Sequence, residues 1–184
     1  AQANNPDWKT VAYDETSGKV VVPNGSIGFR WGQTDGKWNL EEKDAGGAET
    51  KLRLSLLDVR DEVAPVAFPY FGGIETENFR RNDQGKDVLV RNVPVKKLQS
   101  AEGEILVASV FDLLLANYGI DRGLGGGNVA SSFDQNVPYT PAWQQSITGV
   151  KAADVISVAR QFADNADKTH GKSMVIIGAA MNHW

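Results

Sequence analysis

The 184-residue sequence predicts an α+β fold: a β-rich antiparallel region, followed by a helix-rich α/β piece that ends in a buried strand. Three observations predict this class. Short β-prone runs alternate with turn residues before residue 108, helical periodicity dominates after it, and a continuous apolar run follows the last helical segment. We therefore divide the chain into a β-rich insertion region, 1–107, and a helical α/β piece, 108–184.

Two features near the N-terminus predict antiparallel strands. Residues 20–31 are two β-prone runs joined by Asn24 and Gly25, a pair that tolerates the positive φ needed at both central positions of a tight hairpin turn. Residues 51–56 alternate polar and apolar side chains, and this alternation predicts a half-buried strand.

Further strands are predicted before residue 108. Residues 88–90 and 93–95 are apolar runs, and Pro94 predicts an edge or bulged strand because proline cannot donate a ladder hydrogen bond. A turn separates them from another apolar run, 105–107. The β-rich region therefore extends to the point where helical periodicity begins.

Three helices are predicted in the second half of the chain. Residues 109–118 are apolar around most of the helix circumference, so this helix should be buried on most sides. Thr140 followed by Pro141 is typical of a helix start, with a side-chain cap and proline at the first helical position. Residues 151–167 carry apolar side chains at three- and four-residue spacing, which predicts an amphipathic helix.

The apolar run 174–177 suits a strand buried on both faces, as in a parallel sheet. A helix followed by a strand is half of an α/β unit, and the strand that should precede the helix is missing. The chain begins at Ala1 and ends at Trp184, close after this run. We therefore expect an excised piece of a longer polypeptide.

Composition excludes several kinds of site within this chain. The sequence has no cysteine and only two histidines, which excludes disulfides, thiolate metal sites and a cysteine nucleophile, and leaves too few ligands for a transition metal. The net charge of −4 gives no electrostatic reason to bind nucleic acid. No apolar run approaches the roughly 20 residues of a membrane-spanning helix.

The stretch from Gly178 to His183 is the candidate binding loop, because ligands in open α/β sheets bind outside the carboxyl ends of strands. Small residues there allow close backbone approach, and Asn182 and His183 add polar groups. A plain strand exit with a surface histidine is equally compatible with this position. The glycine-rich stretch 123–128 misses the spacing of a phosphate-binding loop and is interpreted as a connector.

An alternative function is a β-rich module that binds a carbohydrate or a partner without catalysis, since five tryptophans could stack on sugar rings. The five are scattered along the sequence, which favours core or interface positions instead. A carbohydrate-binding face would need several exposed tryptophans on one concave surface.

Several short segments, spread over the whole length of the sequence, resemble one family. These segments are residues 23–32, 68–73, 115–119, 139–143, 147–150 and 162–171, the last continuing to Trp184. Together they are similar to the catalytic alpha subunit of membrane-bound respiratory nitrate reductase, a molybdopterin oxidoreductase. The first hundred residues or so resemble only the nitrate reductase branch.

The resemblance implies a two-electron reduction of nitrate to nitrite at a molybdenum bis-(molybdopterin guanine dinucleotide) centre, with one [4Fe–4S] cluster in the full-length subunit. It implies partners as well: an iron–sulfur beta subunit and a haem-containing membrane gamma subunit, with the alpha subunit on the cytoplasmic face of the cell membrane. The piece 108–184 would contribute to the cofactor-binding domain. His183 would approach the molybdenum–pterin centre, with Asn182, Met181 and Gly178 lining the pocket. The cluster-binding motif and the molybdenum-ligating aspartate lie upstream in the family, so we expect no catalytic residue, no metal ligand and no activity in this chain alone.

Overall fold

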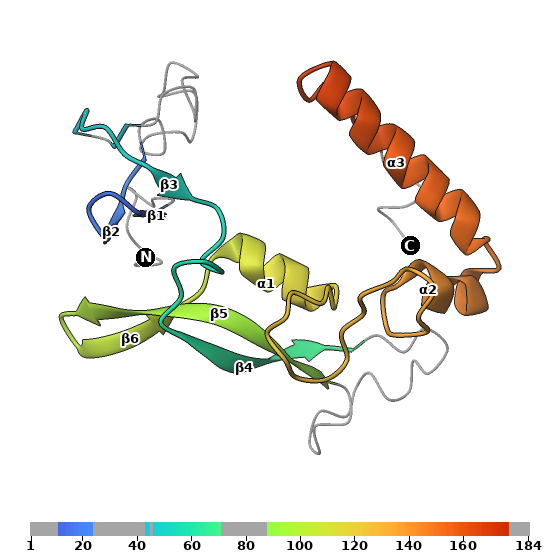
Figure 1. Ribbon diagram of the computed structural model, residues 1–184, viewed down its shortest axis with the longest axis horizontal. Helices are drawn as coiled ribbons and strands as arrows, with labels where there is room; N and C mark the ends of the chain where they lie inside the picture. The colour runs from blue at the N-terminus through green and yellow to red at the C-terminus, as the bar shows by residue number, and fades with distance from the viewer. Residues whose placement is uncertain (1–10, 24–42, 45, 71–87, 177–184) are drawn as a thin grey trace. The chain divides into compact units, whose positions relative to one another are not determined.

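The computed structural model describes residues 11–23, 43–44, 46–70 and 88–176 (Figure 1). It confirms a mixed α+β fold, with the strands before residue 108 and the helices after it. Contacts between residues divide the chain into two compact units, Ala1–Ala64 with Val93–Leu114, and Pro65–Asn92 with Leu115–Trp184. The predicted boundary between 107 and 108 remains a prediction.

The first unit contains a small antiparallel sheet in the order β2-β1-β3. Its strands are β1 (Ala12–Asp14), β2 (Lys19–Val21) and β3 (Leu52–Arg53). The buried Asp14 carboxylate organises the turn between β1 and β2, because it accepts hydrogen bonds from the backbone N–H groups of Thr16 and Ser17. The same carboxylate accepts the N–H of Lys51 at 2.7 Å, so one side chain joins the turn to the approach to β3.

Two strand predictions are confirmed only in part. Residues 20 and 21 lie in β2, whereas the turn at Asn24 and Gly25 and the run after it lie outside the described residues. The strand predicted over 51–56 is confined to Leu52–Arg53, and Leu54 is exposed. Pairing stops there because the next residues turn toward a helix N-terminus, where the N–H of Leu56 donates to Asp112 at 2.7 Å.

A second sheet has the order β4-β5-β6. Its strands are β4 (Glu62–Pro69), β5 (Val88–Ser100) and β6 (Gly103–Val107). Pro94 predicted an edge or a bulged strand, and the edge alternative is wrong, because β5 is the central strand. Pro94 is tolerated there because the antiparallel pairing of β5 with β6 begins two residues later, at Lys96 opposite Val107.

The helices are α1 (Val110–Asn117), α2 (Pro141–Thr148) and α3 (Ala152–Lys168). The predicted cap of α2 is confirmed, since Thr140 Oγ1 accepts the N–H of Trp143 at 3.1 Å. Gly149, with φ of 73°, ends the helix in the left-handed conformation. Helix α1 is less buried than predicted, because Val110 and Leu114 are exposed.

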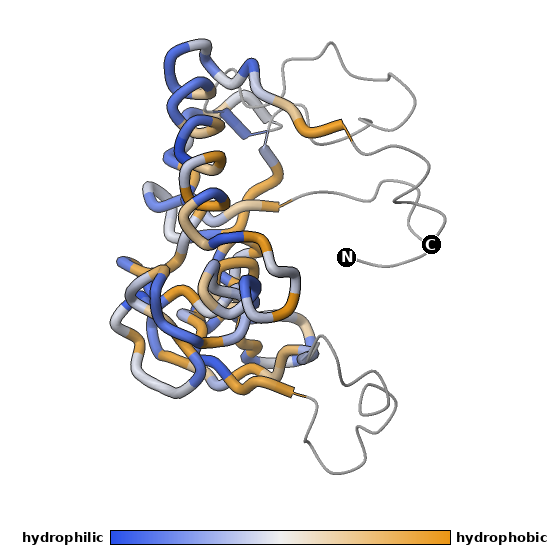
Figure 2. Tube along the Cα trace, turned by 90° about the vertical axis from the view of Figure 1, so that its right-hand side faces the viewer, coloured by the Kyte–Doolittle hydropathy of each residue, from blue (hydrophilic) through white to orange (hydrophobic). Residues whose placement is uncertain are grey.

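The strand predicted at 174–177 is not formed over Met174–Ile176, and these three side chains are exposed. Residue 177 lies outside the described residues. An extended apolar run needs neighbouring strands to bury its faces and pair its backbone, and the described part of the chain places none beside it. Figure 2 shows the run in the hydrophobic colour, and along α3 hydrophobic and hydrophilic residues interleave.

Candidate functional site

The residues predicted to line a cofactor pocket are Gly178, Met181, Asn182 and His183, and all four lie outside the described residues. Their assignment therefore remains a prediction. The structure does describe the segments that lead to them: α2, α3, the turn that ends α3, and the extended residues up to Ile176. All of these segments belong to the second unit.

The turn after α3 is fixed by backbone hydrogen bonds that end the helix and reverse the chain. Gly171 donates its N–H to the carbonyl of Ala166 at 2.7 Å, and Thr169 donates to Asn165 at 3.0 Å. His170 and Gly171 adopt φ of 54° and 87°, the left-handed conformation that terminates many helices. His170 itself lies in this turn and is exposed.

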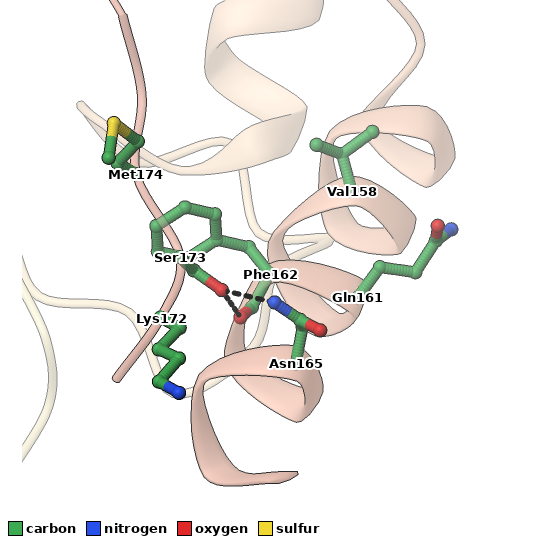
Figure 3. A pocket seen from close by; sticks show the side chains of 7 residues that line it. All are labelled: Val158, Gln161, Phe162, Asn165, Lys172, Ser173 and Met174. Carbon is green, nitrogen blue, oxygen red and sulfur yellow. Dashed lines mark hydrogen bonds between the residues drawn. The ribbon is translucent and has the colours of Figure 1, made fainter. Parts of the chain in front are cut away.

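An open groove of about 430 Å³ lies between α3 and the segment that follows this turn (Figure 3). Asn165 Nδ2 donates to Ser173 Oγ at 2.8 Å, and that hydroxyl donates to the carbonyl of Phe162 at 3.4 Å, so the segment is tied to the helix. The groove is apolar at one end and polar at the other. Its lining comprises Val158, Gln161, Phe162, Asn165, Lys172, Ser173 and Met174.

The junction between α2 and α3 is held by glutamine side chains. Gln145 Oε1 accepts the N–H of Ala152 at 2.7 Å, and Gln144 Nε2 donates to the carbonyl of Val150 at 2.9 Å. These bonds satisfy backbone groups at the end of one helix and the start of the next. The direction of α3 relative to α2 is therefore set locally.

The buried guanidinium of Arg91 is the polar centre of the second unit. Its Nε and Nη1 donate to the carbonyls of Asn128 and Asn117, each at 2.8 Å, and Nη2 lies 3.5 Å from the carbonyl of Pro138. Burial lowers the pKa of Arg91 from its usual value, while the nearby Tyr139 acts in the opposite direction. Within the described residues, backbone carbonyls rather than a carboxylate solvate this charge.

Tyr139 connects this centre to α2. Its ring centroid lies 5.5 Å from the Arg91 guanidinium carbon and packs edge-on against Tyr118 and Trp143, at 6.5 and 5.3 Å. Its hydroxyl donates to the carbonyl of Pro69 at 3.1 Å. The φ of Tyr139 is 78°, which is unfavourable for a side chain of this size, so the surrounding contacts hold a strained residue in place.

The Arg91–Tyr139 cluster was not predicted from the sequence. Arg91 lies inside an apolar run that predicts a strand, and a buried charge needs polar partners. This position could therefore have indicated a buried polar cluster around Arg91. Core or interface positions were predicted for the tryptophans. Trp143 is half-buried against Tyr139, and the other four tryptophans lie outside the described residues, so no sugar-stacking face is seen in the described part.

In the first unit the charged side chains form local networks. The Glu15 carboxylate accepts hydrogen bonds from the Arg53 side chain at 2.8 Å and from the Lys51 side chain at 2.9 Å. These hydrogen bonds lower the pKa of Glu15 to about 2, and the bond from Arg53 has the largest effect. Lys96 bonds the carboxylate of Asp61 at 3.0 Å, and this bond is the main cause that raises the pKa of Lys96. These contacts join strands and turns.

The glycine-rich stretch 123–128 forms a connector after α1, as predicted, with Asn92 Nδ2 bonding the carbonyl of Leu124 at 2.9 Å. Across the described residues, no group of three or more histidine, cysteine, aspartate or glutamate side chains could hold a metal ion. None of the helices in these residues is long and apolar enough to cross a membrane.

Comparison with known proteins gives matches over the whole chain. It is 57% identical to the respiratory nitrate reductase 1 alpha chain of Escherichia coli over 185 residues, and 56% identical to the respiratory nitrate reductase 2 alpha chain of the same organism. It is 41% identical to the nitrate reductase alpha chain of Bacillus subtilis, again over its full length. The chain belongs to the nitrate reductase alpha-chain family.

The chain spans about 15% of the length of these curated relatives. No family model matches it. Membership in the alpha-chain family confirms the resemblance noted in the sequence.

Proposed function

We propose that this chain is a segment of a nitrate reductase catalytic subunit, which reduces nitrate to nitrite and water with two electrons and two protons. The observation that carries the proposal is 57% identity over the whole chain to a respiratory nitrate reductase alpha chain. Because the chain corresponds to about 15% of such a protein, activity is expected only together with the rest of the alpha subunit.

The proposed cofactors of the full-length subunit are a molybdenum bis-(molybdopterin guanine dinucleotide) and one [4Fe–4S] cluster. The chain has no cysteine with which to ligate an iron–sulfur cluster. The proposed role of the chain is to supply pocket wall, with Gly178, Met181, Asn182 and His183 as the candidate residues.

The proposed partners are an iron–sulfur beta subunit and a haem-containing membrane gamma subunit, which would deliver the electrons. The proposal is supported by the names of the relatives, which are alpha chains of nitrate reductases. The alpha subunit would lie on the cytoplasmic face of the cell membrane, and nucleic acid is not an expected partner of a chain with net charge −4.

The test uses the complete alpha subunit containing this chain, assembled with its partners. Nitrate-dependent oxidation of reduced methyl viologen and bound molybdenum are measured for the wild type, His183→Ala and His170→Ala. We expect His183→Ala to lower activity or molybdenum content, and the exposed His170→Ala to leave both unchanged. Wild-type values for His183→Ala would refute the site assignment, and a wild-type subunit that loads molybdenum without reducing nitrate would refute the function.

A further inference from the structure

The connector between α1 and α2, residues 118–140, is long and contains no helix or strand of its own. In compact domains, connections longer than about 12–15 residues without secondary structure are uncommon, and the ordered ones usually serve a function. This connector is ordered by its own backbone: Asp121 donates its N–H to the carbonyl of Ala130, and Ala130 donates to the carbonyl of Gly119. It therefore has a defined conformation within the second unit.

Arg91 ties the two ends of the connector together, and it does so with a buried charge. Its guanidinium donates to the carbonyls of Asn117 at the end of α1 and Asn128 inside the connector, and lies 3.5 Å from the carbonyl of Pro138. The side chain is fully buried, so its charge had to be desolvated. Tyr139 beside it has a φ of 78°, a strained conformation for an aromatic residue.

A desolvated charge and a strained backbone are both unfavourable, and they occur at neighbouring residues of one cluster. Strained residues persist only where the surrounding structure holds them, and they concentrate at functional sites. A cluster that served stability alone could be replaced by apolar side chains, often without loss of stability. The Arg91–Tyr139 cluster therefore points to a requirement for position.

The cluster sets the position of α2. Tyr139 directly precedes Thr140, whose Oγ1 accepts the N–H of Trp143 and caps the helix. The Tyr139 ring also packs edge-on against the Trp143 ring, with 5.3 Å between the centroids. Both the first residue of α2 and its first turn are therefore held against the Arg91 guanidinium.

Helix α3 takes its direction from α2. Residues 149–151 join the two helices (Figure 1), and the side chains of Gln144 and Gln145 bond the backbone of Val150 and Ala152 across this link. No residue of α3 is buried in the described part of the chain, so its junction with α2 is its main support there. The 17 residues of α3 extend over about 25 Å, and a rotation of about 5° at the junction moves the far end by about 2 Å.

The far end of α3 leads to the candidate binding loop, residues 178–183. Asn165 on α3 donates to Ser173 Oγ at 2.8 Å, so the segment after the helix moves together with it. The candidate loop follows this segment in the sequence. Because a displacement of about 1 Å at reacting groups can lower a rate about 100-fold, a small rotation of α2 would be sufficient to impair catalysis.

We propose that Arg91 and Tyr139 are positioning residues of the alpha subunit: they fix α2, and α2 and α3 carry that position to the chain before the candidate binding loop. The inference rests on the proposed function and on the assignment of residues 178–183 to the cofactor pocket. Neither side chain contacts substrate or cofactor in this proposal, because both act through the two helices.

The test uses the complete alpha subunit assembled with its partners. Arg91→Met removes the guanidinium, and Tyr139→Asn removes the ring while keeping a residue that tolerates the left-handed backbone. Turnover per bound molybdenum is measured with nitrate and reduced methyl viologen, since a residue that only stabilises the fold would change the molybdenum content and leave the turnover of loaded molecules unchanged. We expect kcat per bound molybdenum to fall about 10-fold or more in both variants.

Two matched variants serve as controls. Arg160→Met, at an exposed position of α3, should leave kcat per bound molybdenum unchanged. Tyr139→Phe keeps the ring and removes only the hydroxyl bond to Pro69, so it should stay within about twofold of the wild type. A loss in Tyr139→Phe as large as that in Tyr139→Asn would overturn the role given to the ring contacts.

A structural measurement decides the proposal independently of activity. Cryo-electron microscopy of the variants, superposed on residues 88–92 and 115–117, should show the end of α3 at Lys168 displaced by about 1 Å or more, with or without bound molybdenum. An undisplaced α3, or wild-type kcat per bound molybdenum in both variants, would overturn the proposal. A wild-type subunit that does not reduce nitrate would instead refute the proposed function, so the two failures are distinguishable.

Discussion

Replacing Arg91 with methionine should loosen the connector between α1 and α2. The change removes two hydrogen bonds of 2.8 Å from a charged donor to the carbonyls of Asn117 and Asn128, and the contact with the Tyr139 ring. Charge-assisted bonds contribute about 1.5–3 kcal/mol each, and the cation–π contact about 0.5–2 kcal/mol. The guanidinium also no longer has to be desolvated, so we expect a net loss of roughly 2–4 kcal/mol.

Native-state hydrogen exchange reads this loss at two amides of the connector. Asp121 donates its N–H to the carbonyl of Ala130, and Ala130 donates to the carbonyl of Gly119. The expected loss corresponds to exchange faster by roughly 30- to 700-fold at these amides. Arg160→Met, on the exposed surface of α3, is the matched control and should leave them unchanged. Unchanged exchange in the Arg91 variant would refute the view that its hydrogen bonds hold the connector.

Three further predictions concern other positions. Gly119→Ala should destabilise the same connector by about 1–3 kcal/mol, because φ is 69° and a Cβ would lie 2.6 Å from Arg91 Nη2. Gly171→Ala, whose Cβ would meet no atom within 4 Å, should cost less. Equal exchange rates at the Asp121 and Ala130 amides in the two variants would contradict this. Asp112→Ala should speed exchange at the Leu56 amide, because a buried donor then loses its acceptor at a cost of about 1–3 kcal/mol. Slow exchange there would show that the hydrogen bond between Leu56 and Asp112 is dispensable. The lowered pKa of Glu15, about 2, means that its contribution to stability is complete above the ordinary pKa and is lost as the pH falls from there toward 2; an NMR titration of this carboxyl with a midpoint near its ordinary value would contradict the ion pairs.

Local signals in the sequence predicted local structure correctly. The Thr140 cap and Pro141 start of α2 depend on neighbouring residues alone, and the structure has both. The strand predicted over 51–56 was too long because the backbone N–H of Leu56 donates a hydrogen bond to a distant carboxylate, that of Asp112, instead of pairing with a strand. Alternation cannot reveal a partner 56 positions away along the chain.

The remaining differences come from tertiary context. Pro94 is tolerated in a central strand because pairing with β6 starts only at Lys96. The presence of a proline does not reveal at which residue the pairing with a neighbouring strand begins. The Arg91–Tyr139 cluster joins residues 48 positions apart, and its polar partners are backbone carbonyls, which carry no sequence signal. The uncovered run Met174–Ile176 has the composition of a buried strand, and the described chain lacks the neighbours that would bury it.

The central claim, that this chain serves as part of a nitrate-reducing subunit, is tested most directly by segment exchange. The 184 residues replace the corresponding stretch of the Escherichia coli respiratory nitrate reductase 1 alpha chain, to which they are 57% identical, and nitrite formation from nitrate is measured with reduced viologen. We predict a chimeric enzyme that binds molybdenum and forms nitrite, and in which His183→Ala lowers this activity or the molybdenum content. A folded, molybdenum-loaded chimera that forms no nitrite would contradict the account.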